Sequence, residues 1–563
     1  MTNHGNPFII PITMESQKIW ATLDPFHEGG AIMGRSVANE ALLRALLALD
    51  PCDEYHFFLR DRKLVQSVDA FLACEFPAIH GAGRFAVRTR EALPGALAST
   101  PYHCFHLSDC INFPAHLARL RNALAPQIFP ITGTTHSLSY TRYMTDFLAH
   151  MWKGTTARDC VVATSSGAAQ VVGSIYDHLS EQYGPLPRPR VERIPLGVDT
   201  EALRPPTPQE RTAARAQFGL VDGELAVLVF ARISHFSKMD LVPVLRVVRR
   251  MDRQCAVPGG VRLLVAGWTE EGDSYPETLV NLATNAGVHL DVVPRPDEQA
   301  KCALYHAADV FLSPVDNPQE TFGLTVLEAA AAGLPAVVSD YDGYRDLVLH
   351  NETGLLVPTI GPDGTVDVDS LAPLMYDHEY HLLLAQQTVV DVGACARALG
   401  SLAADPARRA RLGRAARARA EAGFSWRLVA EKYAALWDRL WAEPVDAEAL
   451  RGYVHPLHMP YARIFGGYPS RVFGPDLVLS WTPSGEAVYR DQDFITIYDD
   501  IESRVDPETV KRTVFFARKP VAADELLRKL MAVCGLGLEQ ARFLILWALK
   551  HDLLERADDG IGS

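Results

Sequence analysis

Short apolar runs of strand length alternate with longer amphipathic stretches in the first half of the chain. The apolar runs occur at residues 18–23, 55–59, 85–88, 103–107, 128–133 and 160–164. Helical patterns, such as those at residues 33–49 and 114–123, lie between them. Strands that alternate with helices favour a parallel sheet covered by helices on both faces. We therefore predict a Rossmann-like α/β domain over residues 1–203.

The same alternation starts again after a proline-rich connector. Pro205, Pro206 and Pro208 interrupt both helices and strand ladders, so they mark a domain boundary. Further strands, each followed by a helical pattern or a turn, are expected at residues 225–231, 261–267, 288–293, 310–312 and 335–338. They predict a second Rossmann-like domain at residues 204–425, followed by a helix at 426–444.

Residues 445–563 show a different pattern. Two helical stretches, 522–533 and 538–550, are joined by a turn that contains Gly535 and Gly537. This pattern predicts a small α+β appendage of winged-helix-like form. The second stretch carries only two cations, whereas a recognition helix must offer hydrogen-bond donors to DNA. We therefore expect the appendage to contact a protein partner or a second copy of the chain.

Composition and charge restrict the class of protein. The chain has 563 residues, of which 48% are hydrophobic and 22% are charged, enough for two or three domains with full cores. A formal net charge of -14 argues against nucleic acid as the main partner, because phosphate binding requires concentrated cations. Nine scattered cysteines without a Cys-x-x-Cys pair favour reduced thiols in the cytosol and no structural zinc. No apolar segment approaches the roughly 20 residues that span a bilayer, and no signal peptide is expected.

The most informative stretch lies at residues 313–348. A short apolar strand leads into a loop that contains Glu320, the backbone turns at Gly323, and a helix follows. The first N–H groups of that helix, at Gly323, Leu324 and Thr325, lack partners inside the helix, and the helix dipole attracts an anion there. We expect this helix start to bind phosphate.

Two carboxylates of this stretch, Glu320 and Glu328, are eight residues apart, one in the loop and one in the second turn of the helix. A carboxylate can accept two hydrogen bonds from a vicinal diol, so Glu328 could hold a ribose while Glu320 meets hydroxyls of a second sugar. Spacing alone favours a simpler interpretation, in which both are solvated surface glutamates. The residues around them decide between the two interpretations.

The string Glu-Thr-Phe-Gly-Leu-Thr-Val-Leu-Glu-Ala at residues 320–329, with Gly333-Leu-Pro335 and Gly343 beyond it, closely resembles the donor-site signature of family 4 retaining glycosyltransferases of the GT-B fold. The resemblance extends over roughly residues 18–441. It implies two Rossmann-like domains that face each other across a cleft, with a last helix that crosses back to the first domain.

The resemblance also implies roles for individual residues. Arg232 and Lys238, in the loop after the first strand of the second domain, would hold the donor diphosphate together with the helix-start amides. Glu328 would hold the ribose, and Glu320 and His136 would contact the sugar. The other residues expected at the donor site are Gly29, Gly30, Phe322, Gly323, Leu324 and Thr325. Without the resemblance, the cations and the paired glycines would be ordinary surface and turn residues.

These expectations describe a retaining glycosyltransferase that moves a sugar from a nucleoside-diphosphate donor, of UDP or GDP type, with no metal and no cofactor. Cations and N–H groups would stabilise the charge on the leaving diphosphate. The acceptor could be a small molecule, a glycan, a lipid or a peptide. Two alternatives stay open: an epimerase or phosphorylase of the same architecture, and a nucleotide-sugar sensor or scaffold without turnover. Residues 359–389 form an apparent insertion that could act as a lid or a subunit contact.

Overall fold

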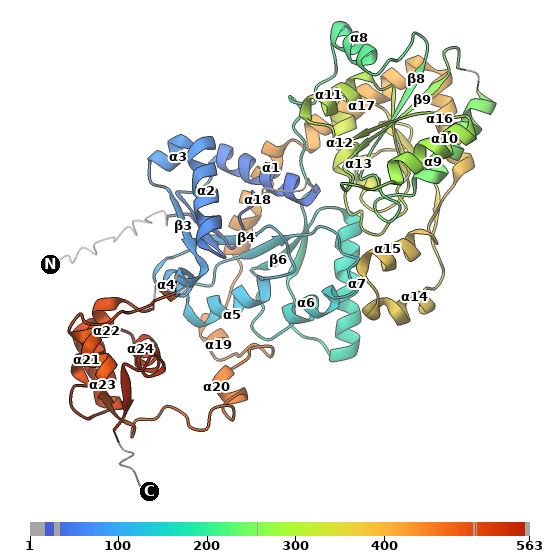
Figure 1. The fold of residues 1–563 in the computed structure, drawn as a ribbon. Coiled ribbons are helices and arrows are strands. Elements are labelled where there is room, and N and C mark those ends of the chain that lie inside the picture. The colour runs from blue at the N-terminus through green and yellow to red at the C-terminus, as the bar shows by residue number, and fades with distance from the viewer. Residues whose placement is uncertain (1–16, 28–33, 256, 499–500, 503, 558–563) are drawn as a thin grey trace, which may run out of the picture. The chain divides into compact units, whose positions relative to one another are not determined.

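The computed structural model describes residues 17–27, 34–255, 257–498, 501–502 and 504–557. The chain divides into two compact units, Met1–Leu457 and His458–Ser563. The larger unit contains two Rossmann-like domains with parallel sheets, and the smaller unit contains the C-terminal appendage (Figure 1). The α/β fold expected from the sequence is therefore confirmed.

A seven-stranded parallel sheet forms the first domain, in the order β3-β2-β1-β4-β5-β6-β7. Its strands are β1 (Ile19–Thr22), β2 (Glu54–Leu59), β3 (Phe85–Thr89), β4 (Cys104–Leu107), β5 (Ile131–Thr134), β6 (Asp159–Ala163) and β7 (Arg190–Arg193). Its helices are α1 (Gly34–Leu49), α2 (Arg62–Glu75), α3 (Pro77–Gly81), α4 (Leu93–Ser99), α5 (Pro114–Leu124), α6 (Tyr143–His150) and α7 (Ser166–Tyr183). Tyr55 and Phe57 of β2 belong to the core with α1 and α2, whereas Phe58 belongs to the core with α4 and α5. Successive side chains of a strand point to opposite faces, so the sheet is covered on both.

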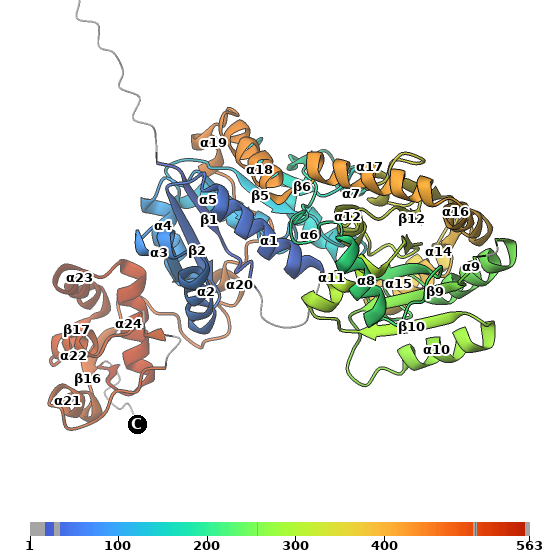
Figure 2. The ribbon, with the colours of Figure 1, turned by 90° about the horizontal axis from the view of Figure 1, so that it is seen from above.

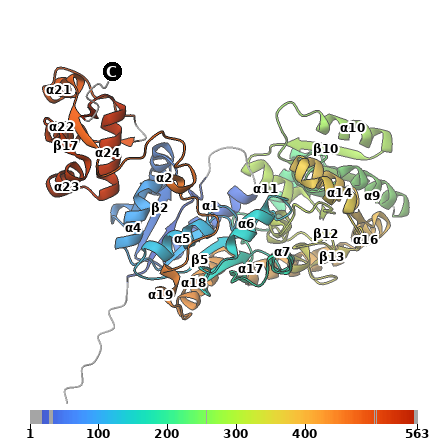
Figure 3. The same cartoon turned by 90° about the horizontal axis from the view of Figure 1, so that it is seen from below.

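A six-stranded parallel sheet forms the second domain, in the order β10-β9-β8-β11-β12-β13. Its strands are β8 (Leu225–Phe230), β9 (Val261–Gly267), β10 (His289–Pro294), β11 (Val310–Ser313), β12 (Ala336–Ser339) and β13 (Gly354–Val357). Its helices include α8 (Pro208–Gln217), α9 (Leu241–Gln254), α10 (Tyr275–Ala286), α11 (Glu298–Ala307), α12 (Leu324–Ala331), α13 (Tyr344–Leu347) and α16 (Val392–Ala404). Helices again cover both faces (Figure 2), and β10 forms one edge of the sheet beside α10 (Figure 3). Val227 of β8 lies in the core with α9 and α16, and Leu228 lies in the core with α11 and α12.

Helix α17 (Pro406–Gly423) packs closely against the C-terminal end of α12. A Cβ atom built at Gly413 would lie 2.0 Å from the carbonyl oxygen of Gly333. One turn further on, Arg417 donates to the carbonyl oxygen of Ala331 at 2.7 Å. The last carbonyl groups of a helix have no partner inside it, so this guanidinium satisfies an end of α12.

The helix that follows α17, α18 (Trp426–Trp441), packs against the first domain. The hydroxyl group of Tyr433 lies 2.8 Å from Thr134 Oγ1, and Trp437 donates from Nε1 to Thr132 Oγ1 at 3.0 Å. Both aromatic side chains are buried in the core that also contains Trp20. A short helix, α19 (Ala447–Arg451), follows it.

The insertion expected at residues 359–389 forms two short strands and two helices. Strand β14 (Thr359–Ile360) pairs antiparallel with β15 (Val389–Val390), and α14 (Val366–Leu371) and α15 (Asp377–Ala385) lie between them. His381 of α15 is buried, and its Nε2 lies 2.8 Å from the hydroxyl oxygen of Ser139 in the first domain. The insertion therefore contacts the segment that follows His136.

The C-terminal unit is a small α+β structure. Its antiparallel sheet has the order β17-β16-β18, with β16 (Val478–Trp481), β17 (Val521–Ala522) and β18 (Leu554–Arg556). Its helices are α20 (Tyr461–Ile464), α21 (Pro483–Tyr489), α22 (Pro507–Phe516), α23 (Ala523–Cys534) and α24 (Leu538–Lys550). In the part of the chain that the structure describes, no single helix is long and apolar enough to cross a membrane; α23 and α24 pass that test only as a pair bent by 117°. Leu526, Leu530 and Leu544 of this pair are buried in the core of the unit, which accounts for its apolar character.

The contact at Gly413 predicts a reversal of the usual effect of glycine in a helix. Alanine in place of a mid-helix glycine normally stabilises a protein by about 0.5–1 kcal/mol. At Gly413 the added methyl group would meet the Gly333 carbonyl, so we expect Gly413→Ala to destabilise the fold by about 1–3 kcal/mol. Gly173, inside α7, has open space where its Cβ would be, so Gly173→Ala should raise the melting temperature. Calorimetric melting of both variants checks this, and an increase for Gly413→Ala would contradict the packing.

Candidate active site

The candidate site lies where two loops leave the centre of the second sheet. Strands β8 and β11 are neighbours, and the strand order runs outward from them in both directions. Loops after two such strands diverge and leave a crevice at the carboxyl edge of the sheet. The loop after β8 carries Arg232 and Lys238, and the loop after β11 carries Glu320.

Lys238 and Glu320 form an ion pair across these loops. Lys238 donates from Nζ to Glu320 Oε2 at 2.9 Å, and Glu320 Oε1 accepts from the backbone N–H groups of Thr321 and Phe322, each at 3.2 Å. The Glu320 side chain is buried, whereas 40% of the Lys238 side chain is exposed. The carboxylate is therefore held in one orientation, and the ammonium group has donors left for a ligand.

Helix α12 begins beside this ion pair. Gly323 has a φ of 106°, and a Cβ atom there would lie 2.3 Å from the ring of Tyr344, so only glycine fits this turn without displacement of the ring. Phe322 is buried in front of it. The first turn, at Leu324 and Thr325, therefore has backbone N–H groups without partners inside the helix, as an anion site requires.

Glu328 has two partners on α11 that sequence reasoning missed. Lys301 donates from Nζ to Glu328 Oε1 at 2.7 Å, and the Tyr305 hydroxyl group donates to Glu328 Oε2 at 2.9 Å. Burial alone would lower the pKa of Lys301, but the charge of Glu328 and its hydrogen bond raise it on balance. The i, i+4 spacing of Lys301 and Tyr305 was the available signal, because it places both side chains on one helix face.

Two further carboxyl groups in the second domain, Asp342 and Asp316, were not singled out from the sequence. The Oδ1 atom of each is buried and has no hydrogen-bond partner among the described residues. Burial raises the pKa of both groups to about 7, and the charge of Glu320 adds to the shift of Asp342. Both carboxyl groups therefore exchange a proton near neutral pH.

Arg232 contacts a different neighbour from Lys238. Its guanidinium carbon lies 5.4 Å from the ring centre of Trp268, a cation–π contact. Arg232 and Trp268 line a cavity of about 290 Å³ whose wall also includes His235 and Glu270. Arg232 therefore lines this cavity, whereas Lys238 is paired with Glu320.

His136 is oriented by the backbone of the first domain. Its Nε2 lies 2.8 Å from the carbonyl oxygen of Ser108, so this nitrogen carries a proton and donates. The next residue, Ser137, donates from its hydroxyl group to the carbonyl oxygen of Gln319 at 2.8 Å. The end of β5 thus contacts the loop that carries Glu320. Gly29 and Gly30, the other predicted site residues of this domain, lie outside the described residues.

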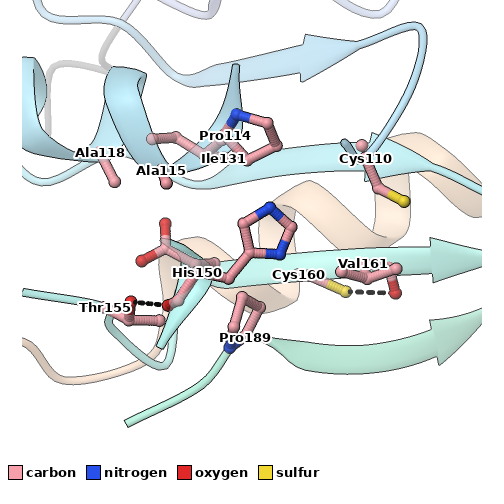
Figure 4. A pocket seen from close by; sticks show the side chains of 12 residues that line it. Cys110, Pro114, Ala115, Ala118, Ile131, His150, Thr155, Cys160, Val161 and Pro189 are labelled. Atoms are coloured by element: carbon pink, nitrogen blue, oxygen red, sulfur yellow. Dashed lines mark hydrogen bonds between the residues drawn. The ribbon is translucent and has the colours of Figure 1, made fainter. Parts of the chain in front are cut away.

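A second cavity, in the first domain, is too small for a sugar. It has a volume of about 20 Å³ and is lined by side chains that include Cys110, His150 and Cys160 (Figure 4). Such a space holds about one water molecule.

Over the ranges that the structure describes, no group of three His, Cys, Asp or Glu side chains could hold a metal ion.

Comparisons with known proteins find similarity over the segment that contains these residues. Residues 210–367, which contain Arg232, Lys238, Glu320 and Glu328, match the family model described as "Glycosyl transferases group 1". A D-inositol 3-phosphate glycosyltransferase from Nocardia farcinica is 33% identical over 271 residues, which are 46% of this chain and 51% of that protein. A GDP-mannose-dependent monoacylated alpha-(1-6)-phosphatidylinositol monomannoside mannosyltransferase from Corynebacterium glutamicum is 28% identical over 249 residues, 43% of this chain and 55% of that protein. The chain thus spans about half the length of the curated relatives it matches.

Solved structures agree on the fold. A glycosyltransferase from Rickettsia africae superposes with a TM-score of 0.51 at 15% identity and covers 76% of this chain and 100% of that one. The N-terminal domain of trehalose-6-phosphate phosphatase from Candida albicans superposes with a TM-score of 0.51 at 12% identity, over 75% of this chain and 97% of that one. The larger unit therefore has the GT-B fold.

The pKa of Asp342 predicts that this residue limits stability at high pH. The pKa is about 7 in the folded chain against an ordinary value of 3.8, so the folded state holds the proton better. Stability is therefore lost as the pH rises from about 4 to 7, and the loss is complete above pH 7. Asparagine does not ionise, so Asp342→Asn should raise the melting temperature more at pH 8 than at pH 5. In the free energy of unfolding, the two gains should differ by on the order of 1–3 kcal/mol.

Thermal melting at the two pH values measures this difference. Asp363→Asn, at an exposed carboxylate of the insertion, is the matched control and should change the melting temperature little. An equal shift of Asp342→Asn at both pH values would show that the carboxyl group does not titrate as stated.

Proposed function

We propose that the protein is a retaining glycosyltransferase that takes a sugar from a nucleoside-diphosphate donor of UDP or GDP type. The observation that carries this proposal is the ion pair between Lys238 and Glu320 beside the first turn of α12. It lies inside the segment that matches the glycosyl transferases group 1 family model. The site thus combines a partly exposed cation, backbone N–H groups and a fixed carboxylate.

The cation and the N–H groups would act on the leaving group. As the bond between the sugar and the diphosphate breaks, negative charge grows on the diphosphate oxygens. Lys238 and the amides of Leu324 and Thr325 would stabilise that charge, with Arg232 as a second cation. Backbone donors need no reorganisation at that moment, so no metal ion is required in this scheme.

The carboxylates would position the two sugars of the donor. Glu328, fixed by Lys301 and Tyr305, would accept hydrogen bonds from the ribose hydroxyl groups, since each carboxylate oxygen can accept a second hydrogen bond. Glu320 and His136 would contact the transferred sugar. Glu320 already accepts three hydrogen bonds, which makes it a weak nucleophile, so we propose that leaving group and acceptor occupy the same face of the sugar.

Inositol phosphates and phosphoinositides are the first acceptors to test. Two of the relatives are named for action on an inositol 3-phosphate and on a phosphatidylinositol monomannoside. All nine cysteines are free thiols, which supports a reducing compartment such as the cytosol as the place of the reaction.

Loss of Lys238 should slow catalysis more than loss of any surface lysine. Removal of one preorganised charge stabiliser typically costs a factor of about 10²–10³ in rate. We expect Lys238→Ala to lower the rate of sugar release from the preferred UDP- or GDP-sugar by at least about a hundredfold. Release of sugar to water, measured by chromatography, needs no acceptor and would also report the anomer of the product.

Lys519→Ala, at an exposed lysine of the C-terminal unit, is the matched control and should retain full activity. A melting curve must show that Lys238→Ala is folded, because the variant leaves Glu320 buried without its cation. Tight nucleotide binding without any transfer or hydrolysis would reject the enzyme and favour a nucleotide-sugar sensor. A trapped glycosyl-enzyme adduct would reject the same-face mechanism.

The contact of Glu328 with ribose predicts a coupling between protein and ligand. Calorimetry of the matched nucleoside diphosphate and its 2′,3′-dideoxy analogue should show weaker binding of the analogue to the wild type, by roughly tenfold. In Glu328→Ala the two ligands should bind with nearly equal affinity, because the acceptor of the hydroxyl groups is gone. An unchanged ratio would place the ribose elsewhere.

A further inference from the structure

The C-terminal unit begins with an exposed apolar segment, residues 458–472, here called the connector. It contains α20 and precedes β16. Five of its large apolar residues have more than half of their surface exposed, up to 78% at Tyr468; these are Met459, Tyr461, Ile464, Tyr468 and Val472. Phe465 between them is partly buried. The ring of Phe465 lies 4.9 Å from that of Tyr461 and 5.1 Å from that of Tyr468, so the aromatic side chains form a continuous row.

The connector carries only positive charge, in a chain whose net charge is -14. No Asp or Glu occurs in the sequence between Glu448 and Asp476, whereas Arg463 and Arg471 both lie in the connector and are exposed. Neither guanidinium forms an ion pair with any residue that the structure describes. Arginines elsewhere in this unit do so: Arg490 pairs with Glu486 at 2.5 Å and Arg528 with Asp524 at 3.0 Å.

We propose that the connector binds a membrane surface that carries anionic lipids. Tyrosine and phenylalanine rings prefer the headgroup region, aliphatic side chains reach the acyl boundary, and arginines pair with lipid phosphates. Two arginines are too few for a nucleic-acid groove, which tracks many phosphates. Anionic lipid is the surface that complements both the charge and the apolar character of this segment.

A second exposed apolar patch provides a contrast. The insertion exposes Val366, Leu374 and Tyr376, but no Lys or Arg occurs in the sequence between Arg345 and Arg397. Five acidic residues lie around these side chains in the sequence: Asp363, Asp367, Asp369, Asp377 and Glu379. An anionic membrane would repel this patch, so apolar exposure without cations should not give lipid binding.

Sedimentation of the full chain with vesicles tests the proposal. The probes are vesicles of phosphatidylcholine alone and of phosphatidylcholine with 30% phosphatidylglycerol as the anionic lipid. We expect binding to the anionic vesicles only, reduced by high salt. Each arginine near an anionic surface contributes roughly a fivefold factor in partition, so Arg463→Gln/Arg471→Gln should weaken binding by about 25-fold. Tyr461→Ser/Tyr468→Ser should also weaken it.

Two double variants are matched controls. Arg490→Gln/Arg528→Gln removes the same charge from the same unit, and Leu374→Ser/Tyr376→Ser removes apolar surface from the insertion; both should bind anionic vesicles like the wild type. Lys238→Ala should bind equally well, so lipid binding and sugar transfer can fail separately. Absence of wild-type binding, or equal losses in the connector and control variants, would overturn the proposal. A change of oligomeric state in the connector variants, without a change in lipid binding, would make the connector a protein contact instead.

Discussion

The candidate site depends on two contacts in which α12 leaves no room for a side chain. At its start, Gly323 turns against the ring of Tyr344, and beyond its end the carbonyl group of Gly333 lies against Gly413 of α17. Both contacts bring backbone against a neighbouring group, so the helix has little freedom to slide or tilt. A site that binds an anion through N–H groups needs this rigidity, because backbone donors do not adjust by side-chain rotation.

The carboxyl groups around the site differ in the number of hydrogen bonds that each accepts. Glu320 has three donors and Glu328 has two, so both are held in one orientation. Asp342 and Asp316 each have a buried oxygen without a hydrogen-bond partner among the described residues, and burial raises the pKa of both. Fixed carboxylates can position a sugar, whereas buried carboxyl groups that gain a proton can act as donors themselves.

The pattern of apolar residues along the chain was sufficient to predict most strands of the two parallel sheets. The runs at 55–59 and 261–267 correspond to β2 and β9, and the helix expected after Gly323 corresponds to α12. Strand β7 was missed because Arg190 and Arg193 are exposed, so it has no apolar run. Strand β16 was missed as well, because it has only four residues and one fully buried side chain, Leu479.

The sequence by itself determined which residue types lie at the start of α12. The turn at Gly323 and the spacing from Glu320 to Glu328 belong to one continuous segment, so they are local features. Only the tertiary structure decided their partners. Lys238 pairs with Glu320 across 82 positions, Lys301 with Glu328 across 27, and His136 with the Ser108 carbonyl across 28. Periodicity describes a side chain's direction within one element. The distance between two charges depends on how separate elements pack, and this packing is a property of the whole fold.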